Sequence, residues 1–436
     1  MKSRQLTCVA AMTVLFALAI PFQVKSQEEE RPKAHNFPHY SITDLGTLGG
    51  RFSLAVGLNN QGVVVASSNL SGNEVGGNQT VHVFRWHDGA KTNLGTLGGP
   101  QSIVGFNNPI NNSGVITGNS NISTPDPNGE DFCGIGFTLI CLPFVWQKGV
   151  MTALPLLGGN NGLAGGINSR GQIVGVAETA VTDPCSFAFL QVEAVIWQNG
   201  QVEELPPFPG DSIGNAIANN DKGEVVGATG CQATNTVRAV LWPDGPNGGV
   251  IDLGNLGSGA FNLAFGINNR SQIVGQSPLP DNTLHAFLWQ DGVMNDLGSL
   301  PGLPGSEANG INDHGQVVGF SFDANGDESS NVAWIWEKGT MTDLNNLAPA
   351  DSPWFLMEAL GINDRGQIAG KMFNLMTGDI HGFLATPVRN KQSDGLVEAN
   401  HATKATTKVP SASVRETLRH RLSVQDNRFH GWPTRR

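Results

Sequence analysis

Short apolar runs alternate with turn residues along most of the chain. From Leu263 onward the order is LAFGIN, a turn, QIVGQS, a loop, LHAFLW, a turn and VMNDLG. Apolar runs of this length, bounded by Asn, Asp and Gly, are typical of strands that pair as hairpins. The pattern therefore predicts a unit of four β-strands, the third of which ends in Trp.

This unit recurs along the sequence. Its marker is the Asn that opens the turn after the first strand, which occurs at Asn59, Asn111, Asn168, Asn220, Asn268, Asn312 and Asn363. The intervals between these markers are 52, 57, 52, 48, 44 and 51 residues. Tandem four-stranded units of this length are the sequence signature of β-propeller blades. We therefore predict an all-β fold, a seven-bladed β-propeller that spans residues 40–388.

The two ends of the repeat region predict how the propeller closes. The segment YSITDLG, which begins at Tyr40, matches the last strand of a unit but has no unit in front of it. The seventh unit, in turn, stops at Pro387 without that strand. The N-terminal strand is expected to complete the last blade and so to protect its open edge. A linear solenoid is the alternative, but it offers no reason to split one repeat in two.

The turn after the first strand has a recurring chemistry. Its Asn side chain can bond the backbone two residues on, and six units place Gly three residues after it, where φ can be positive. The fifth unit has Ser271 at that position. This departure predicts either local strain or another type of turn.

Several motifs resemble one known family. LGTLGG at Leu45 and Leu94, the GINxxGQVVG pattern and HAFLW at His285 are similar to the HAF family of extracellular repeats, and the likeness extends to about Pro387. The family is one of secreted bacterial repeat proteins without an assigned biochemical activity. The resemblance therefore implies export and leaves the function open. Four units lack the His of this motif, which argues against a symmetric histidine site.

Charge separates a body from its two ends. Residues 27–388 hold 13 Lys and Arg against 33 Asp and Glu, whereas residues 389–436 hold 10 against 4. We interpret residues 1–26 as a signal peptide, because a basic start precedes an apolar run; an uncleaved anchor is the alternative. Residues 27–39 are a short linker. The basic tail, residues 389–436, is expected to be disordered, with a short helix allowed near Arg415 to Val424.

Four cysteines follow the predicted signal peptide. Cys133 and Cys141 share one insertion, and Cys185 and Cys231 lie in loops of neighbouring units. In a secreted, periplasmic or extracellular protein, this arrangement predicts the disulfides Cys133–Cys141 and Cys185–Cys231. A zinc site is the alternative, but the spacings contain no CxxC pair.

The strand order defines two faces. The loops after the second and fourth strands form a loop face, and the turns after the first and third strands form a turn face. The insertions and many acids fall on the loop face, which disfavours nucleic acid as a partner. The same face carries aromatic residues that could stack on sugar rings, namely Phe52, Phe261, Trp354 and Phe355. We expect a glycan ligand there; packing between blades is the alternative role of these rings.

One loop contains the beginning of a Ca²⁺ pattern. Asp323, Asn325 and Asp327 alternate as in the first half of such a loop, but no bidentate Glu follows at the required spacing. A solvated turn is therefore the alternative to a weak calcium site, and no other cofactor is expected.

No motif identifies a reaction. GxSxG, HExxH and phosphate-binding glycine loops are absent from the sequence, and no pair of acids is singled out. The sequence favours a monomeric binding module without a membrane span in the mature chain. A polysaccharide-cleaving propeller and a structural or adhesive surface protein are the alternatives.

Overall fold

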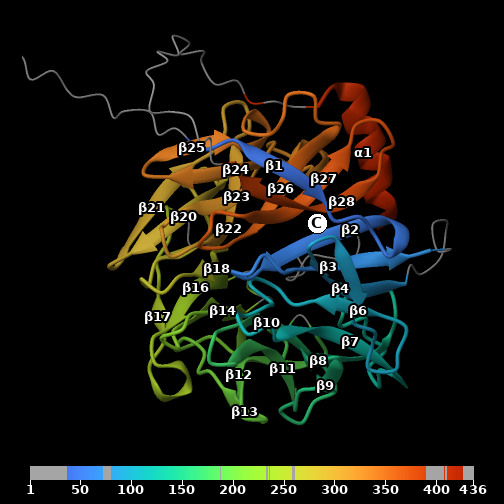
Figure 1. The fold of residues 1–436 in the computed structure, drawn as a ribbon. Coiled ribbons are helices and arrows are strands. Elements are labelled where there is room, and N and C mark those ends of the chain that lie inside the picture. Colours follow the sequence, from blue (N-terminus) through green and yellow to red (C-terminus); the bar gives the residue numbers. More distant parts are fainter. Residues whose placement is uncertain are drawn as a thin grey trace, which may run out of the picture. The chain divides into compact units, whose positions relative to one another are not determined.

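The computed structural model describes residues 37–71, 80–186, 188–231, 234, 236–257, 261–388, 407 and 410–425. The predicted signal peptide, residues 1–26, lies outside the described residues, as does the predicted linker up to residue 36. Figure 1 shows that the described chain consists almost entirely of strands. The prediction of an all-β fold is therefore confirmed.

Five sheets contain four antiparallel strands each, in chain order (Figure 1). Their strands are β6 (Ser102–Val104), β7 (Ile116–Pro125), β8 (Leu139–Gln147), β9 (Val150–Ala153); β10 (Gly162–Ile167), β11 (Ile173–Thr182), β12 (Leu190–Gln198), β13 (Gln201–Glu204); β14 (Ile213–Asn219), β15 (Val225–Cys231), β16 (Thr236–Trp242), β17 (Ile251–Asp252); β18 (Leu263–Ile267), β19 (Ile273–Pro278), β20 (Leu284–Gln290), β21 (Val293–Gly298); and β22 (Gly305–Ile311), β23 (Val317–Phe322), β24 (Val332–Glu337), β25 (Thr340–Asp343). Repeated sheets of this kind are the architecture of a β-propeller.

The sixth sheet has eight strands. They are β2 (Gly49–Leu58), β3 (Val64–Leu70), β4 (Val81–His87) and β5 (Ala90–Asn93), together with β26 (Trp354–Ile362), β27 (Ile368–Asn374), β28 (Ile380–Pro387) and β1 (Tyr40–Asp44). The two groups of four are joined through one parallel bridge, between Phe52 and Ile380. This sheet thus consists of two units of the predicted size that share a single bridge pair.

β1 occupies the edge position that the split repeat predicts. It pairs antiparallel with β28, from Tyr40 opposite Pro387 to Asp44 opposite Phe383. Tyr40 is buried, and its N–H donates to the carbonyl of Leu347, at 2.9 Å. The first strand of the propeller is therefore held by residues more than 300 positions away in the chain.

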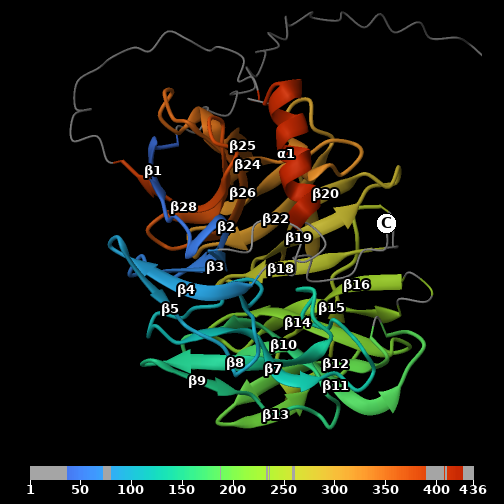
Figure 2. The same ribbon diagram turned by 90° about the vertical axis from the view of Figure 1, so that its right-hand side faces the viewer.

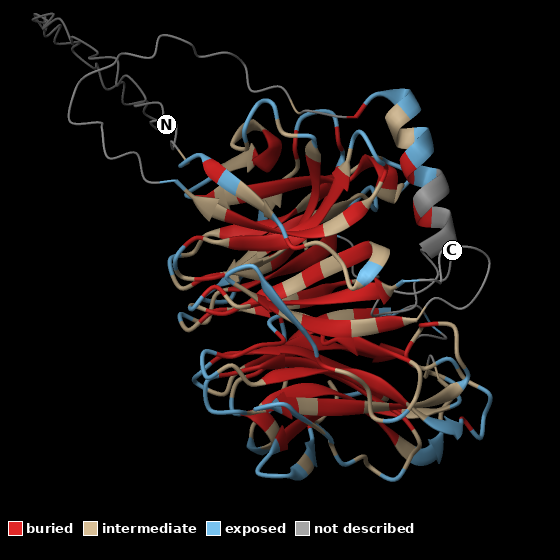
Figure 3. Cartoon of the chain, turned by 45° about the vertical axis from the view of Figure 1, so that its right-hand side comes forward, coloured by how far each residue is buried: buried red, intermediate tan, exposed pale blue. Residues whose placement is uncertain are grey.

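The core lies between neighbouring sheets, where buried side chains follow the inner positions of the strands (Figure 3). Trp242 of β16 packs in one cluster with Ile196 of β12, and its Nε1 donates to the carbonyl of Pro206, at 2.7 Å. Trp197 likewise donates to the carbonyl of Pro155. The Trp residues that end third strands thus fill the space between sheets, as expected for large aromatic side chains with one donor.

The tail departs from the prediction in one part. Residues 412–425 form a helix, α1 (Ala412–Gln425), that belongs to the same compact unit as the sheets. It contacts the short 3₁₀ helix η3 (Glu328–Ser330). Figure 2 shows α1 beside the sheets. The short helix that the sequence allows near Arg415 to Val424 is thus present but longer at both ends, and its apolar side chains belong to a cluster with residues of the sheets. The remainder of the tail, apart from residues 407, 410 and 411, lies outside the described residues.

Both predicted disulfides are present. Cys133 is joined to Cys141 and Cys185 to Cys231, with Cα atoms 5.5 and 4.4 Å apart. Cys133 and Cys185 lie in loops of the loop face, and the disulfides join these loops to β8 and to the end of β15. No helix in the described part of the chain is long and apolar enough to cross a membrane.

Candidate ligand-binding cavity

The seven marker Asn side chains build the turns that follow the first strands. Each Oδ1 accepts two hydrogen bonds, at 3.0–3.1 Å, from the backbone N–H groups two and four residues later in its own turn. This is the local role that the sequence predicts for Asn. It leaves each Nδ2 group free to bond outside its own turn.

Those Nδ2 groups connect the turns to one another. Each donates to the backbone carbonyl of the next marker Asn, at 2.9–3.2 Å, and the seventh bond, from Asn363, returns to Asn59. All seven Asn residues are buried. The hydrogen bonds therefore form a complete cycle through the seven units, here called the Asn cycle.

A second set of bonds runs alongside the Asn cycle through the next residue of each turn. The backbone N–H of that residue donates to the side chain of its counterpart in the following unit, as from Asp313 to Asp364 at 2.9 Å and from Asp364 to Asn60 at 3.0 Å. Four more units do the same. The side chain at this second position thus has a structural role wherever it is Asn or Asp.

These turns surround a cavity of about 110 Å³ on the turn face. Its lining consists of the ends of the first strands and the first two residues of each marker turn, and it contains no aromatic residue. Three of the seven second positions are acidic, namely Asp221, Asp313 and Asp364. The cavity is therefore polar and carries negative charge.

The second carboxylate oxygen of each acid also has a partner. In Asp221, Oδ2 accepts a bond from the hydroxyl of Ser169, at 2.9 Å. In Asp364, Oδ2 accepts a bond from the side-chain amide of Asn60, at 2.7 Å. Since a carboxylate oxygen can accept more than one bond, these groups keep capacity for a ligand. Together with the neighbouring amides they offer both donors and acceptors, which suits hydroxyl groups.

The aromatic residues predicted to bind a glycan do not line this cavity. Phe52 and Phe355 are only 4% and 6% exposed and belong to one buried cluster, so the alternative role in packing fits them. Phe261 and Trp354 are partly buried at the borders of two other clusters. Trp354 stacks against His381, with ring centroids 5.1 Å apart. These two rings alone of the four keep surface that a ligand could reach.

The residues of the predicted calcium loop serve as turn and cap groups. Asp323 Oδ1 accepts from the N–H groups of Asn325 and Asp327. Asp327 caps η3 through the N–H of Ser329 and pairs with Arg419 of α1. Within the described residues, no group of three or more His, Cys, Asp or Glu side chains could hold a metal ion. Asp323 and Asp327 thus have structural roles in the turn, at the start of η3 and in the contact with α1.

Sequence reasoning missed the cavity although its signal is visible. The pair Asn-Asn, Asn-Asp or Asn-Ser opens every marker turn. We assigned it only to the turn itself, because contacts between turns of different units depend on how the units are arranged around one another. The polar residue that recurs at the second position of every turn is the sequence feature that indicates contacts between turns of different units.

Buried acids elsewhere have raised pKa values. Burial, followed by the nearby charge of Glu130, raises the pKa of Glu178 to about 7. Burial likewise raises the pKa values of Glu193 and Glu307 to about 7. None of these three lines the cavity. Protonation of these three acids is therefore expected to change the stability of the fold and not the charge of the cavity.

Comparison with known proteins gives distant likenesses. No family model and no curated protein matches the chain. Among solved structures, the β-propeller domain of the trilobed protease from Pyrococcus furiosus is 11% identical, with a TM-score of 0.47 and coverage of 81% of this chain and 99% of that one. The Pyrococcus horikoshii acylaminoacyl peptidase is 12% identical, with a TM-score of 0.46 and coverage of 78% and 52%.

The Trypanosoma rangeli sialidase is 11% identical, with a TM-score of 0.38 and coverage of 80% of this chain and 57% of that one. The chain thus spans about half the length of the peptidase. Because all three TM-scores lie below 0.5, nothing about the activities of these proteins is carried over.

Proposed function

We propose that this chain is an exported, non-catalytic binding module, and that it binds a hydroxyl-rich ligand, a carbohydrate, in the cavity on the turn face. The observation that carries the proposal is the lining of that cavity by amides and carboxylates from all seven units. Such groups recognise sugars by hydrogen bonds to their hydroxyl groups.

The proposal includes a closed ring of seven blades. Support comes from the Asn cycle, whose last bond joins the seventh unit to the first. Further support comes from β1, which adds a fourth strand to β26, β27 and β28. A ring of this kind would hold the cavity residues in fixed positions, which lowers the entropic cost of ordering them on binding.

The proposal of export rests on chemistry of the sequence and of the loops. The two disulfides are of the kind that persists in oxidising compartments. The N-terminal residues 1–26 have the pattern of a signal peptide. Both features agree with the family resemblance.

The first experiment is a glycan array with the mature protein, followed by affinity measurements on the best-binding glycan. Asp313→Asn and Asp364→Asn are the informative variants, because other units carry Asn at this position and the turns should fold. Replacing a charge-assisted hydrogen bond by a neutral one should weaken binding roughly tenfold. Asp291→Asn is the matched control: it makes the same change on the turn face, outside the cavity lining.

The loop-face hypothesis is tested in the same assay. Trp354→Ala should leave the affinity unchanged if the cavity is the site, and should weaken binding if a ring of the loop face stacks on the sugar. Loss of affinity in Trp354→Ala alone would move the site to the loop face. Failure of every glycan on the array to bind would overturn the choice of ligand.

A reducing-end release assay on polysaccharides that bind distinguishes a binding module from an enzyme. We expect no release above the level of a heat-denatured sample. Release that disappears in a cavity variant would instead support a polysaccharide-cleaving propeller.

A further inference from the structure

The helix α1 presents one apolar stripe to the rest of the molecule. Val414, Leu418 and Leu422 are four residues apart and so share one face of the helix. Leu418 and Leu422 are 0% and 4% exposed, although the mean hydropathy of the helix is low. Their burial shows that α1 is docked on a matching surface and not merely helical in isolation.

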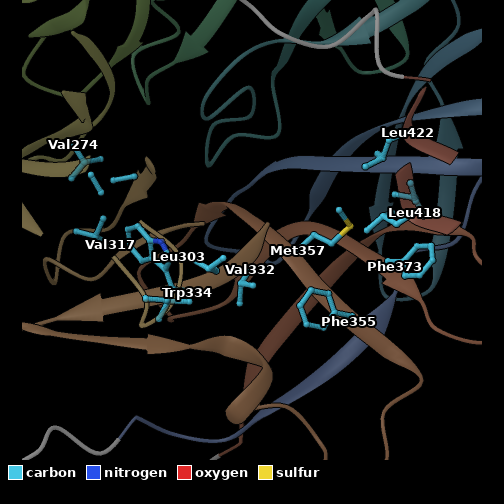
Figure 4. Packing of buried hydrophobic residues seen from close by; sticks show 14 of the residues in the cluster. Val274, Leu303, Val317, Val332, Trp334, Phe355, Met357, Phe373, Leu418 and Leu422 are labelled. Atoms are coloured by element: carbon cyan, nitrogen blue, oxygen red, sulfur yellow. The ribbon is translucent and has the colours of Figure 1, made fainter. Parts of the chain in front are cut away.

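α1 packs into an apolar cluster to which both ends of the repeat region contribute. Leu418 and Leu422 belong to the same buried cluster as Phe52 of β2, Phe355 and Met357 of β26 and Phe373 of β27. In Figure 4 the two leucines lie on the side of the cluster where Phe373 and Met357 project. Two of the rings that the sequence predicts on the loop face are therefore members of the cluster that α1 completes.

Polar contacts set the position of α1. Arg419 pairs with Asp327, just before η3, and the hydroxyl of Thr407 donates to the carbonyl of Pro301, at 2.8 Å. Burial alone would raise the pKa of Asp327, but its bonds to Arg419 and Ser329 lower it below the ordinary range. Both anchor points lie on loop-face connections of the sheet β22–β25.

The contact between α1 and η3 leaves two buried polar atoms without hydrogen bonds in the described part of the chain. Arg415 Nε of α1 and Glu328 Oε2 of η3 are buried with no hydrogen-bond partner among the described residues. Unpaired buried polar atoms weaken an interface. A helix of 14 residues is also marginal in water by itself, so its stability depends on staying docked. A state in which α1 has left the surface therefore loses the helix together with its contacts.

We propose that the surface formed by Phe52, Phe355, Met357, Phe373 and Asp327 is a recognition site for one amphipathic helix, and that α1 is its intramolecular occupant. The site takes Leu at positions i and i+4, with Arg directly after the first Leu. Another helix of this pattern reaches the surface only when α1 has left it. This inference concerns the loop face and is independent of the carbohydrate proposal.

The test uses the full chain with Leu418→Asp and Leu422→Asp, which removes the two buried leucines of the stripe and leaves the sequence of the propeller unchanged. A fluorescently labelled peptide of residues 407–425 is titrated with this variant and with the wild type, and anisotropy is measured. The variant should bind the peptide at least tenfold more tightly, because its site is empty. Glu416→Ala, on the exposed side of α1, is the control and should behave as the wild type.

A charge exchange tests the orientation of the bound helix. In the Leu418→Asp, Leu422→Asp background, Asp327→Lys should weaken binding of the wild-type peptide several-fold, and a peptide with Arg419→Glu should recover it. Recovery is not expected from a nonspecific apolar contact.

Three outcomes would overturn the proposal. They are equal peptide binding by the wild type and the double variant, no recovery in the charge exchange, and a wild-type dimer in which α1 docks on a second copy. Light scattering over a range of concentrations detects the last outcome. A thermal melt of the double variant verifies that the propeller is folded.

Discussion

Ser271 shows how a single residue can depart from a repeated turn. Its φ is 61°, in the left-handed region where the other six units have Gly. Its hydroxyl lies 2.9 and 2.8 Å from the two carboxylate oxygens of Glu224 and accepts a bond from Lys222, at 2.9 Å. The turn type is therefore unchanged, and these bonds to the preceding unit offset the strain of the backbone.

This compensation predicts that two small substitutions differ in their effect on stability. Ser271→Ala keeps the strained backbone and loses the hydroxyl bonds, so it should lower the free energy of unfolding by about 1–2 kcal/mol. Ser271→Gly loses the same bonds but relieves about 1 kcal/mol of strain, and should be nearly neutral. Denaturant unfolding measures both, with Ser113→Ala as the exposed control. An alanine variant as stable as the wild type would refute the compensation.

Glu307 predicts a pH dependence at the same scale. Its pKa rises from 4.5 to about 7 because burial disfavours the charged form, with a bond to Asn309 opposing the shift. A carboxyl with a raised pKa in the folded state stabilises the protein fully below its unfolded pKa. That stability is lost as the pH rises through about 7.

The wild type should therefore lose about 1–3 kcal/mol relative to Glu307→Gln between pH 5 and pH 8. Urea unfolding at several pH values measures the difference, and Glu203→Gln on the exposed edge of β13 is the control. A constant difference across this range would mean that Glu307 titrates in the folded protein as it does in the unfolded chain.

Among the elements, β1 is the strand whose contribution to stability can be tested most directly. Tyr40 and Leu45, in and directly after this strand, are 2% and 1% exposed. Deletion of residues 37–46 removes both side chains from the core and exposes the edge of β28. It should cost about 3 kcal/mol or more and lower the melting temperature by several degrees. Cooperative melting at an unchanged temperature would show that β1 adds nothing to the last sheet.

The opposite change should strengthen the same contact. Ser41 and Thr386 are direct partners across β1 and β28, a spacing that suits a disulfide. Ser41→Cys with Thr386→Cys should raise the melting temperature under oxidising conditions, and a reductant should reverse the gain. Either cysteine alone is the control.

Element prediction succeeded where the signal is local. The turn after each first strand opens with Asn, and six of the seven units have Gly three residues later, so the four-stranded unit and the strand at Tyr40 follow from the repeated pattern. The docking of α1 could not be predicted in this way. Three apolar positions in a basic tail indicate a buried helix face only when a surface that covers them is known. For the same reason Phe52 and Phe355 resemble ligand-binding rings in the sequence, and the contacts of the fold are needed to place them in the core.

Across the whole molecule, the two faces differ in charge. Third positions of five consecutive marker turns carry Arg170, Lys222, Arg270, His314 and Arg365, all exposed on the turn face. Four of these side chains, the three Arg and the Lys, are cations, and they follow directly after the second positions, three of which are acids that line the cavity. This arrangement could not be inferred from net charge. It depends on which residue of each turn lines the cavity: the second residue does, and the third does not.

The pairing of β1 with β28 also sets a time order for folding. Ser41 and Thr386 are 345 residues apart, so at 5–20 residues per second a ribosome needs roughly 20–70 s to deliver the partner of the first strand. The strands from β3 to β25 pair with strands close to them in sequence and can form hairpins during that interval, whereas β1 has no partner until β28 is made. A product that stops before residue 380 keeps an open strand edge, and such edges promote aggregation and recognition by chaperones. The pairing of β28 with β1 is therefore the last contact between strands that the growing chain can form.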